Sequence, residues 1–335
     1  MDRVEASRVV LPAALDVLTR PAIVVVGDAV LDEYLFGTAT RLAREAPVPV
    51  LEFTRRLLLP GGAANPARNI AALGAPVSLV AAIGTDSEGA QLRALLATAA
   101  VATRGLVIDP SRPTTRKTRI LTEGLLRYPQ QVARLDYLSR VPISADMATR
   151  VRVALEGAIG EAAAVLCSDY LNGLLTPALV GWLRAYCRER GVLLTVDAQG
   201  ELGKYRGVHV LRCNAEEAQH YLGSPLTSDD DCRTALGAML TQLDVDLVVV
   251  TRGGHGVALQ GRALPYLQIP GRPVEVADTT GAGDTFIAIL TLALAAGIGS
   301  TLAATLANVA AGAVVQHFGN AILTLADLEA LVRQQ

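Results

Sequence analysis

Short runs of apolar, β-branched residues alternate along most of the chain with longer segments of helical periodicity. Near-continuous apolar runs are typical of strands that are buried on both faces of a parallel sheet. The alternation therefore predicts a doubly wound α/β fold, with a mostly parallel central sheet and helices on both faces. The expected strands cover residues 22–28, 77–84, 164–170, 192–198, 209–214 and 246–254, and the expected helices lie near 63–73, 87–99, 144–160, 176–190, 214–222 and 229–243.

Two segments, 31–59 and 105–136, interrupt this rhythm with strand patterns that have no helix between them. We expect them to form a small second sheet that is inserted into the main fold as a lid over one end. The expected organisation is one domain over residues 20–333, preceded by an N-terminal extension, residues 1–19.

The stretch from Thr285 to Gln316 contains no charged residue. A membrane-spanning helix needs about 18 or more consecutive apolar residues. The sequence "GIGS" at 297–300 divides this stretch, which favours two buried helices joined by a turn. The first twenty residues carry charges of both signs, unlike a signal peptide. We therefore expect no membrane partner and a cytoplasmic location.

Composition excludes some classes of function. The chain has 335 residues, 51% of them hydrophobic, and a net charge of −2, which argues against a nucleic-acid partner. Its four cysteines form no C-x-x-C pair and have no histidine cluster beside them. They are typical of free, buried thiols in a reducing compartment and do not suggest a zinc site.

Four of the expected strands end on polar residues: Asp28, Asp169, Asp197 and Asn214. In an open α/β sheet, ligands bind outside the carboxyl ends of the strands. One such aspartate is commonly only a helix cap or a turn former. Four polar ends on one predicted rim favour a ligand site there.

The segment "EVADTTGAGDTF", residues 275–286, leads into the uncharged stretch. Gly281 and Gly283 leave the turn without side chains, so the amides of residues 282–284 can point at one spot at a helix N-terminus, which is an anion site. Asp284 fits two roles: a first-turn acid of the helix, or a base that takes a proton from an attacking hydroxyl. No P-loop motif occurs in the chain.

Several motifs together resemble a known family. The "DTTGAGDTF" segment is similar to the C-terminal signature of the ribokinase (PfkB) family of carbohydrate kinases, and "PGGAANPARNIAALGA" (60–75) resembles its N-terminal glycine motif. "NAEEA" (214–218) resembles the N-x-x-E motif, and "TRGGHG" (251–256) the nucleotide-binding T-x-G-x-x-G. The resemblance covers about residues 20–333, in the family's order and spacing.

The resemblance implies a ribokinase-like fold and transfer of a phosphoryl group from ATP, with Mg²⁺, to a sugar hydroxyl. It gives Asp284 the role of the base, and the amides of Gly281, Ala282 and Gly283 the role of the anion hole. It leaves the need for a monovalent cation open. The residues expected near the nucleotide are Asn214, Glu217, Thr251, Gly253, Gly256 and Asn308, of which Asn214 and Glu217 would also hold Mg²⁺ through water. The residues expected near the sugar are Asp28, Asp32, Gly61, Gly62, Asn65 and Asp169.

Some of these residues have a second interpretation. Asn308 also fits a helix-packing role, and Asp32 also fits a solvated acid in a loop. Basic residues for a sugar phosphate are expected on the inserted sheet: Lys117, Arg119 and Arg134. Lys117 and Arg119 are two positions apart on a strand and share a face. A charged stripe on a strand usually faces solvent, so phosphate binding and solvent exposure both remain open.

Within the family, "GDAVLDEYLFG", "PTTRKTRIL" and "SDYLNG" resemble the branch that phosphorylates D-glycero-D-manno-heptose 7-phosphate at its anomeric hydroxyl. That branch has lysines in "SDYxKG" and "DPKG", where this chain has Asn172 and Gln199, and the segment around Arg127 is longer. Another acceptor such as ribose, fructose or a nucleoside therefore remains an alternative, as does a non-catalytic sugar or nucleotide sensor. Lids in this family pair face to face, which implies a homodimer.

Overall fold

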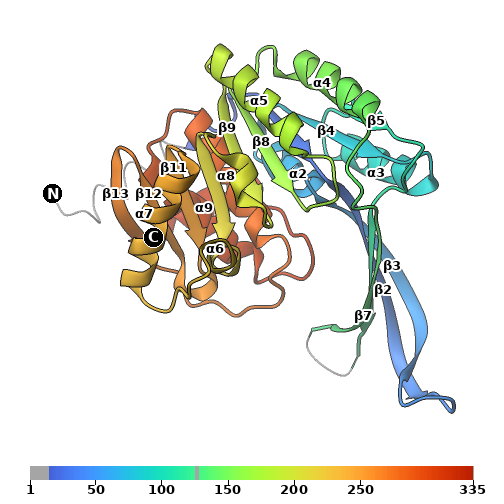
Figure 1. The fold of residues 1–335 in the computed structure, drawn as a ribbon. Helices are drawn as coiled ribbons and strands as arrows, with labels where there is room; N and C mark the ends of the chain where they lie inside the picture. The colour runs from blue at the N-terminus through green and yellow to red at the C-terminus, as the bar shows by residue number, and fades with distance from the viewer. Residues whose placement is uncertain (1–14, 125–127, 335) are drawn as a thin grey trace.

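The computed structural model describes residues 15–124 and 128–334. Its main body contains a nine-stranded sheet in the order β13-β12-β11-β10-β9-β8-β1-β4-β5 (Figure 1). Neighbouring strands from β11 to β5 are parallel, and β12 and β13 form an antiparallel edge. The strands are β1 Ile23–Gly27, β2 Ala29–Leu42, β3 Pro49–Gly62, β4 Val77–Ile83, β5 Leu106–Ile108, β6 Arg116–Thr122, β7 Gln130–Tyr137, β8 Ala164–Asp169, β9 Leu193–Ala198, β10 Val210–Asn214, β11 Leu247–Thr251, β12 Val257–Gly261 and β13 Leu264–Ile269. The helices are α2 Ala64–Ala72, α3 Ser87–Thr98, α4 Ala145–Ile159, α5 Pro177–Arg190, α6 Ala215–Leu222, α7 Asp229–Leu243, α8 Ala282–Ala295, α9 Ser300–Val314 and α10 Leu325–Arg333.

Both faces of this sheet are covered by helices, as the apolar pattern predicted. Along β1, Ile23 and Val25 belong to one core with buried residues of α2, α3, α8, α9 and α10. Val24 and Val26 belong to the opposite core, with α4, α5, α6 and α7. Successive strand side chains point to opposite faces, so a strand that is buried on both sides must be apolar at every position. The predicted fold class is confirmed.

The uncharged stretch forms two helices, α8 and α9, with a short turn between them, as expected. Ten residues of α8 are buried, because this helix lies under the sheet in one of the two cores. Among the described helices, none has the length and apolar character to cross a membrane. The apolar pattern did not predict the β12–β13 hairpin or α10.

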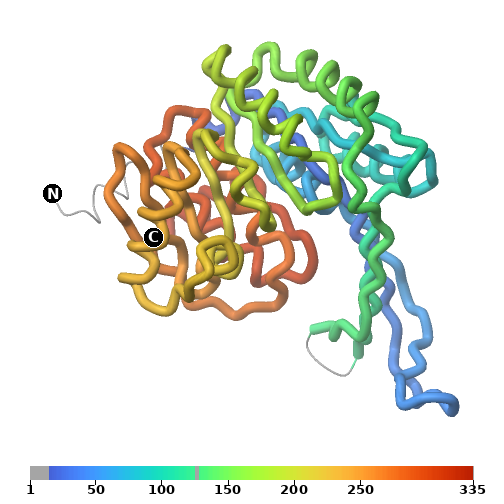
Figure 2. The backbone as a smooth tube through the Cα atoms, in the orientation of Figure 1, coloured from blue at the N-terminus to red at the C-terminus, as the bar shows by residue number. Residues whose placement is uncertain are grey.

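A four-stranded sheet in the order β3-β2-β6-β7 projects from the main body (Figures 1 and 2). It confirms the inserted sheet but corrects its bounds. Strand β5 lies within the segment 105–136 that was expected in the lid, yet it pairs with β4 in the main sheet. Leu106 and Val107 of β5 are buried, so the apolar core of the main body holds this strand.

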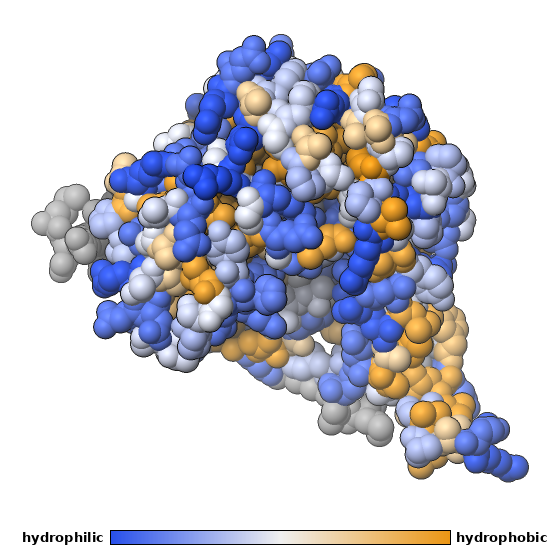
Figure 3. Space-filling view, in the orientation of Figure 1, coloured by the Kyte–Doolittle hydropathy of each residue, from blue (hydrophilic) through white to orange (hydrophobic). Residues whose placement is uncertain are grey.

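The lid contacts the main body through a small aromatic cluster. Tyr34, Phe36 and Leu121 are buried on one face of the lid sheet, and Phe318 packs against them. The ring centroids of Tyr34 and Phe318 are 5.6 Å apart in an edge-on arrangement, which is favourable for aromatic pairs. The apolar atoms that remain on the outside of the lid form a visible patch along its arm (Figure 3).

Candidate active site

The carboxyl ends of the parallel strands bring the predicted rim together. In the register of the sheet, Ser168 pairs with Asp197, and Asp197 in turn pairs with Arg212. The N-terminus of α8 reaches the same edge of the sheet, where a cavity of about 190 Å³ lies. The cavity is lined by Val30, Asp32, Gly62, Lys117, Arg119, Tyr170, Gln199, Thr280, Gly281, Asp284 and Asn320.

The turn before α8 leaves backbone amides available. Gly281 precedes the helix with φ +82°, in the left-handed region, and a Cβ there would lie 2.9 Å from Asn65 Nδ2. No side chain caps this end of the helix. Uncapped N–H groups at a helix N-terminus attract an anion, and the helix dipole adds to the attraction. The turn is therefore suited to hold a phosphoryl group.

Asp284 is buried in the first turn of α8. Its Oδ2 accepts a hydrogen bond from Asn65 Nδ2 at 2.9 Å, and its Oδ1 accepts one from the Tyr170 hydroxyl at 2.7 Å. The carboxylate thus bonds to other elements and does not cap its own helix. The pKa of Asp284 is raised to about 7, mainly by burial and also by the negative charge of Asp197, although the hydrogen bonds from Asn65 and Tyr170 lower it. Such a pKa suits a general base near neutral pH.

The lid contributes the basic wall of the cavity. Arg119 forms an ion pair with Asp32 Oδ1, and Asn320 donates to Asp32 Oδ2 at 2.8 Å. The Nζ of Lys117 lies 4.9 Å from the ring centroid of Tyr170. Lys117 and Arg119 share one face of β6, as their spacing predicted, and both face the cavity. Arg134, on the next strand, is half-exposed and pairs with Asp136 outside the cavity.

The glycine motif before α2 is required for close contact. A Cβ on Gly61 would lie 1.8 Å from Asp32 Oδ2. Gly62 has φ +54°, and a Cβ there would lie 2.2 Å from the backbone oxygen of Asp28. Both positions therefore exclude a side chain, which lets the lid strands join the main body beside Asp32.

The structure does not bring Asp28 and Asp169 to the cavity as predicted. The carboxylate of Asp28 accepts backbone N–H bonds from Tyr170 and Asn172, both at 3.0 Å, and from Leu174 at 3.4 Å. Asp169 accepts from the Tyr205 hydroxyl and pairs with Lys204. Because protein groups already occupy these carboxylates, both acids position the loop after β8.

The two positions that lack the branch's lysines differ from each other. Gln199 lines the cavity, but Asn172 lies buried behind the loop, where it borders a separate cavity of about 10 Å³ together with Arg112. Within the described ranges, the Asn172 Nδ2 has no hydrogen-bond partner. Only the change at Gln199 alters the wall of the active cavity. Arg127 lies outside the described residues.

Sequence reasoning missed a buried cation, Arg212. Its Nη1 lies 2.6 Å from Asp197 Oδ1, and its Nη2 donates to Thr251 Oγ1 at 2.6 Å. A Cβ on Gly283 would lie 2.9 Å from Arg212 Nη1, so the guanidinium lies against the anion turn. The signal was present in the sequence: a charge inside the apolar strand "VLRCN", two residues before Asn214 and on the same face. Arg212 therefore places a guanidinium, paired with Asp197, beside the turn before α8.

Two of the residues predicted for the nucleotide, Asn214 and Glu217, lie at the end of β10 and in the first turn of α6. Asn214 and Glu217 form a capping box at the start of α6, in which Asn214 Oδ1 and Glu217 Oε2 accept backbone N–H bonds. One oxygen of Glu217 remains for a contact through water, which fits the expected role toward Mg²⁺. In the described part of the chain, no three acidic, His or Cys residues form a cluster that would bind a metal ion directly.

The loop at 269–271 joins the remaining nucleotide residues. Asn308 Nδ2 donates to the backbone oxygen of Pro270 at 3.0 Å. Gly256 has φ +84°, and a Cβ there would lie 2.1 Å from the backbone oxygen of Ile269. Gly253, also in the left-handed region, opens the turn that follows Thr251. Asn308 and Gly256 therefore meet at this loop, at the antiparallel edge of the sheet.

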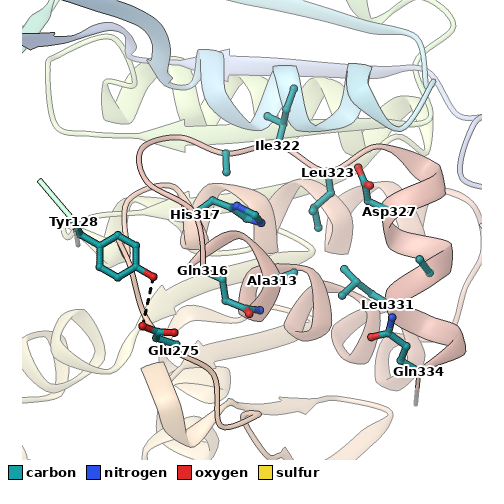
Figure 4. Close-up of a pocket in the computed structure, with 12 residues that line it drawn as sticks. Tyr128, Glu275, Ala313, Gln316, His317, Ile322, Leu323, Asp327, Leu331 and Gln334 are labelled. Atoms are coloured by element: carbon teal, nitrogen blue, oxygen red, sulfur yellow. Dashed lines mark hydrogen bonds between the residues drawn. The ribbon is translucent and has the colours of Figure 1, made fainter.

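A second hollow, of about 810 Å³, lies between the end of α9 and α10 (Figure 4). The lid residue Tyr128 and Glu275 stand at one side of it, with the Tyr128 hydroxyl 3.5 Å from Glu275 Oε1. It contains none of the residues predicted for the base, the anion turn or the sugar. The cavity of about 190 Å³ is lined by Asp284 and is the candidate active site.

The comparison with protein families agrees with this geometry. The sequence model of the pfkB family carbohydrate kinases matches residues 20–326. The chain belongs to the PfkB family of carbohydrate kinases. The resemblance found in the sequence motifs is confirmed, and this PfkB kinase is an enzyme of the carbohydrate kinase class.

Among curated proteins, the kinase is 39% identical to the bifunctional protein HldE of Geobacter sulfurreducens, over 91% of this chain and 61% of that protein. It is 38% identical to the bifunctional protein HldE of Caulobacter vibrioides, over 92% of this chain and 62% of that protein. The chain thus spans less than two thirds of the length of these relatives.

Solved structures of the same fold include ribokinase of Arabidopsis thaliana in complex with ribose and ATP, with a TM-score of 0.71 and 22% identity over 94% of this chain and 99% of that one. Phosphofructokinase-2 of Escherichia coli in complex with fructose-6-phosphate has a TM-score of 0.77 and 20% identity, over 94% and 98% of the two chains. At these identities the likeness shows the ribokinase-like fold.

Proposed function

We propose that this PfkB kinase transfers the γ-phosphoryl group of MgATP to the anomeric hydroxyl of D-glycero-D-manno-heptose 7-phosphate. The observation that carries the reaction is the placement of Asp284, a buried acid with a pKa of about 7, in the turn whose amides form an anion site. The choice of acceptor rests on the motifs shared with the heptose-kinase branch and on the relatedness to HldE proteins.

Asp284 and the turn divide the chemistry between them. The acceptor hydroxyl gives its proton to Asp284, and its oxygen forms a bond to the γ-phosphorus of ATP while the bond from that phosphorus to the β–γ bridging oxygen breaks. The amides of residues 281–283 and the guanidinium of Arg212 stabilise the charge on the transferring group. Asn214 and Glu217 would hold Mg²⁺ through water, and the ion would supply positive charge against the phosphates of ATP.

The acceptor would lie in the cavity beside the lid. Its volume of about 190 Å³ is below the roughly 300–1,000 Å³ typical of drug-sized ligands, which suits a small polar acceptor. Lys117 and Arg119 would bind the 7-phosphate, and Asp32 and Asn320 would bind sugar hydroxyls. Gln199, where the branch has lysine, favours a second candidate: a PfkB kinase for another sugar, such as ribose, fructose or a nucleoside.

A screen for phosphoryl transfer separates these candidates. Purified kinase with MgATP, with and without KCl, is offered heptose 7-phosphate, ribose, fructose, fructose 6-phosphate and adenosine, and phosphorylated products are identified by mass. We expect the heptose 7-phosphate to have the highest kcat/KM. Turnover of a different acceptor alone would replace the heptose assignment, and no acceptor-dependent turnover at all would favour a non-catalytic sensor.

We also propose that the kinase is a homodimer whose lids pair. Phe53, Leu42 and Leu135 are about half or more exposed on the lid, which is a large apolar area to leave in water. The edge strands β3 and β7 are open to pairing as well. Light scattering at micromolar concentration should give twice the chain mass, and Phe53→Asp should shift it to one chain. A wild-type monomer would contradict this proposal.

The working unit that we propose is residues 20–333, lid included, acting in the cytoplasm. The four cysteines are free and buried, which suits a reducing compartment, and ATP is supplied there. Limited proteolysis with and without MgATP and acceptor tests the unit, because a lid that behaves as a separate domain would be released as a fragment.

A further inference from the structure

The hydroxyl of Tyr170 is hydrogen-bonded to Asp284, the proposed base. It donates to Asp284 Oδ1 at 2.7 Å, while Asn65 occupies Oδ2. Both oxygens of the carboxylate are therefore hydrogen-bonded to protein groups. Tyr170 also lines the cavity in which the acceptor would lie. Each carboxylate oxygen can accept two hydrogen bonds, and the Tyr170 hydroxyl holds one of the two positions on Oδ1, from inside the cavity.

The loop that carries Tyr170 is held in a strained shape. Leu171 has φ +58°, in the left-handed region that residues with a bulky side chain rarely adopt. Asp28 binds three backbone amides of this loop, and Asp169 Oδ1 accepts from the N–H of Leu171. Functional sites often contain a strained backbone conformation that the surrounding contacts hold in place. Here it fixes the tyrosine over the base.

A second contact holds the aromatic ring. Lys117 Nζ lies 4.9 Å from the centroid of the Tyr170 ring, within cation–π range. Lys117 comes from the lid, and it is one of the two cations that face the cavity there. An acceptor that binds Lys117 competes for the cation that steadies Tyr170, so acceptor binding and release of the base are linked.

We propose that Tyr170 guards the base, so that Asp284 activates the acceptor and not water. This inference rests on the proposed function. Without an acceptor, the tyrosine hydroxyl takes the Oδ1 position from which a water would give up its proton. Without the guard, that water gives its proton to Asp284 and its oxygen bonds to the γ-phosphorus. The bond to the β–γ bridging oxygen breaks, and ADP and inorganic phosphate form.

The variant Tyr170→Phe tests the guard. It removes the hydroxyl and keeps the ring, so the cavity gains room for water at Oδ1. We expect ATP hydrolysis without any acceptor to rise about tenfold or more above wild type, since a positioned base accelerates proton transfer by about 10²–10⁴-fold. The acidic limb of the pH profile of ATP hydrolysis should lie at higher pH in this variant than the acidic limb of wild-type activity. The reason is that the hydrogen bond from Tyr170, which the variant loses, lowers the pKa of Asp284.

Two further variants make the result decisive. Tyr266→Phe is the control, since it removes a buried tyrosine hydroxyl on β13, outside the cavity. It should leave hydrolysis at the wild-type level. The double variant Tyr170→Phe with Asp284→Asn should return hydrolysis to background, because no base remains to take the proton from water.

The outcomes separate the guard from the proposed function. Acceptor-free hydrolysis by Tyr170→Phe within twofold of wild type overturns the guard, even if sugar phosphorylation is intact. Hydrolysis that persists in the double variant overturns it too, because the water would not be using Asp284. Loss of the proposed function shows differently: acceptor phosphorylation that Asp284→Asn leaves unchanged.

Discussion

The two walls of the active cavity are built from different material. One wall is the turn before α8, made of backbone amides, two glycines and the single carboxylate of Asp284. The other is made of long side chains, Lys117 and Arg119 from the lid and Gln199 from the loop after β9. The backbone wall matches the family motif throughout, and the side-chain wall departs from the heptose-kinase pattern.

This difference separates two questions. Transfer of a phosphoryl group needs donors at fixed positions and a base, which a backbone turn supplies for any acceptor. Choice of acceptor depends on side chains that can change without disturbing that turn. The first wall therefore carries the reaction class and the second carries the substrate, so variants of the first should have the larger effects.

The largest effect should come from Asp284→Asn. The substitution keeps the shape of the side chain but replaces one acceptor oxygen with an NH₂ donor and removes the base, so kcat should fall about 10³-fold. Steady-state kinetics with the acceptor found in the screen measure it. A kcat within tenfold of wild type would show that another group takes the proton.

Gly283→Ala should have the next largest effect. Its Cβ would lie 2.9 Å from Arg212 Nη1 and would force the guanidinium and the turn apart. We expect kcat to fall about 10²-fold, comparable to loss of an oxyanion donor. Gly312→Ala in α9 is the control, since a Cβ there meets nothing within 4 Å. Equal activity of the two variants would contradict a role for close packing at the turn.

The pH dependence of kcat/KM should have an acidic limb near pH 7. Activity requires ionised Asp284, whose pKa is raised to about 7 by burial, so activity falls as pH falls through that value and is roughly tenfold below its plateau at pH 6. Asn65→Ala removes a hydrogen bond that lowers this pKa and should move the limb to higher pH. A limb that stays in place in this variant would assign it to another group.

The raised pKa of Asp284 also makes the free energy of unfolding depend on pH, but in the direction opposite to activity. Since the folded protein favours protonated Asp284, its contribution to the free energy of unfolding is present at low pH and is lost as pH rises through 7. Asp284→Asn should therefore gain stability relative to wild type as pH rises from about 4 to about 7, and the difference should stay constant above that. Thermal unfolding across that range measures the difference.

The side-chain wall should control KM more than kcat. Lys117→Gln removes a cation from the cavity and should raise KM for a phosphorylated acceptor about tenfold, the usual value of a charged hydrogen bond. Arg134→Gln, on the paired strand but outside the cavity, should change KM by less than about twofold. If Lys117→Gln leaves KM unchanged, the acceptor carries no phosphate at this wall.

The smallest effect should be that of Gln199→Lys, which restores the lysine of the heptose-kinase branch. We expect KM for heptose 7-phosphate to fall about threefold, since the added ammonium faces a wet, exposed edge of the cavity. A rise in KM would mean that the acceptor does not place an anion near this position and would favour the alternative sugars.

The apolar pattern alone determined most of the strands, most of the helices and the fold class, because burial on both faces of a parallel sheet leaves few positions for polar residues. The glycine motif determined the anion turn and Asp284 for a similar reason, since the amides of a short turn can point at one spot only without side chains. Such local rules do not tell which side chains from distant parts of the sequence contact each other in the folded protein.

Only the tertiary structure decided which side chains face the cavity. It turned Asp28 and Asp169 toward a loop, put Asn172 behind that loop, and brought Tyr170 and Arg212 to the base and the turn. Tyr170 and Asp284 are 114 positions apart in the chain. Contacts over such distances depend on how layers pack, and a single sequence determines local periodicity much more directly than it shows the pairing of distant side chains.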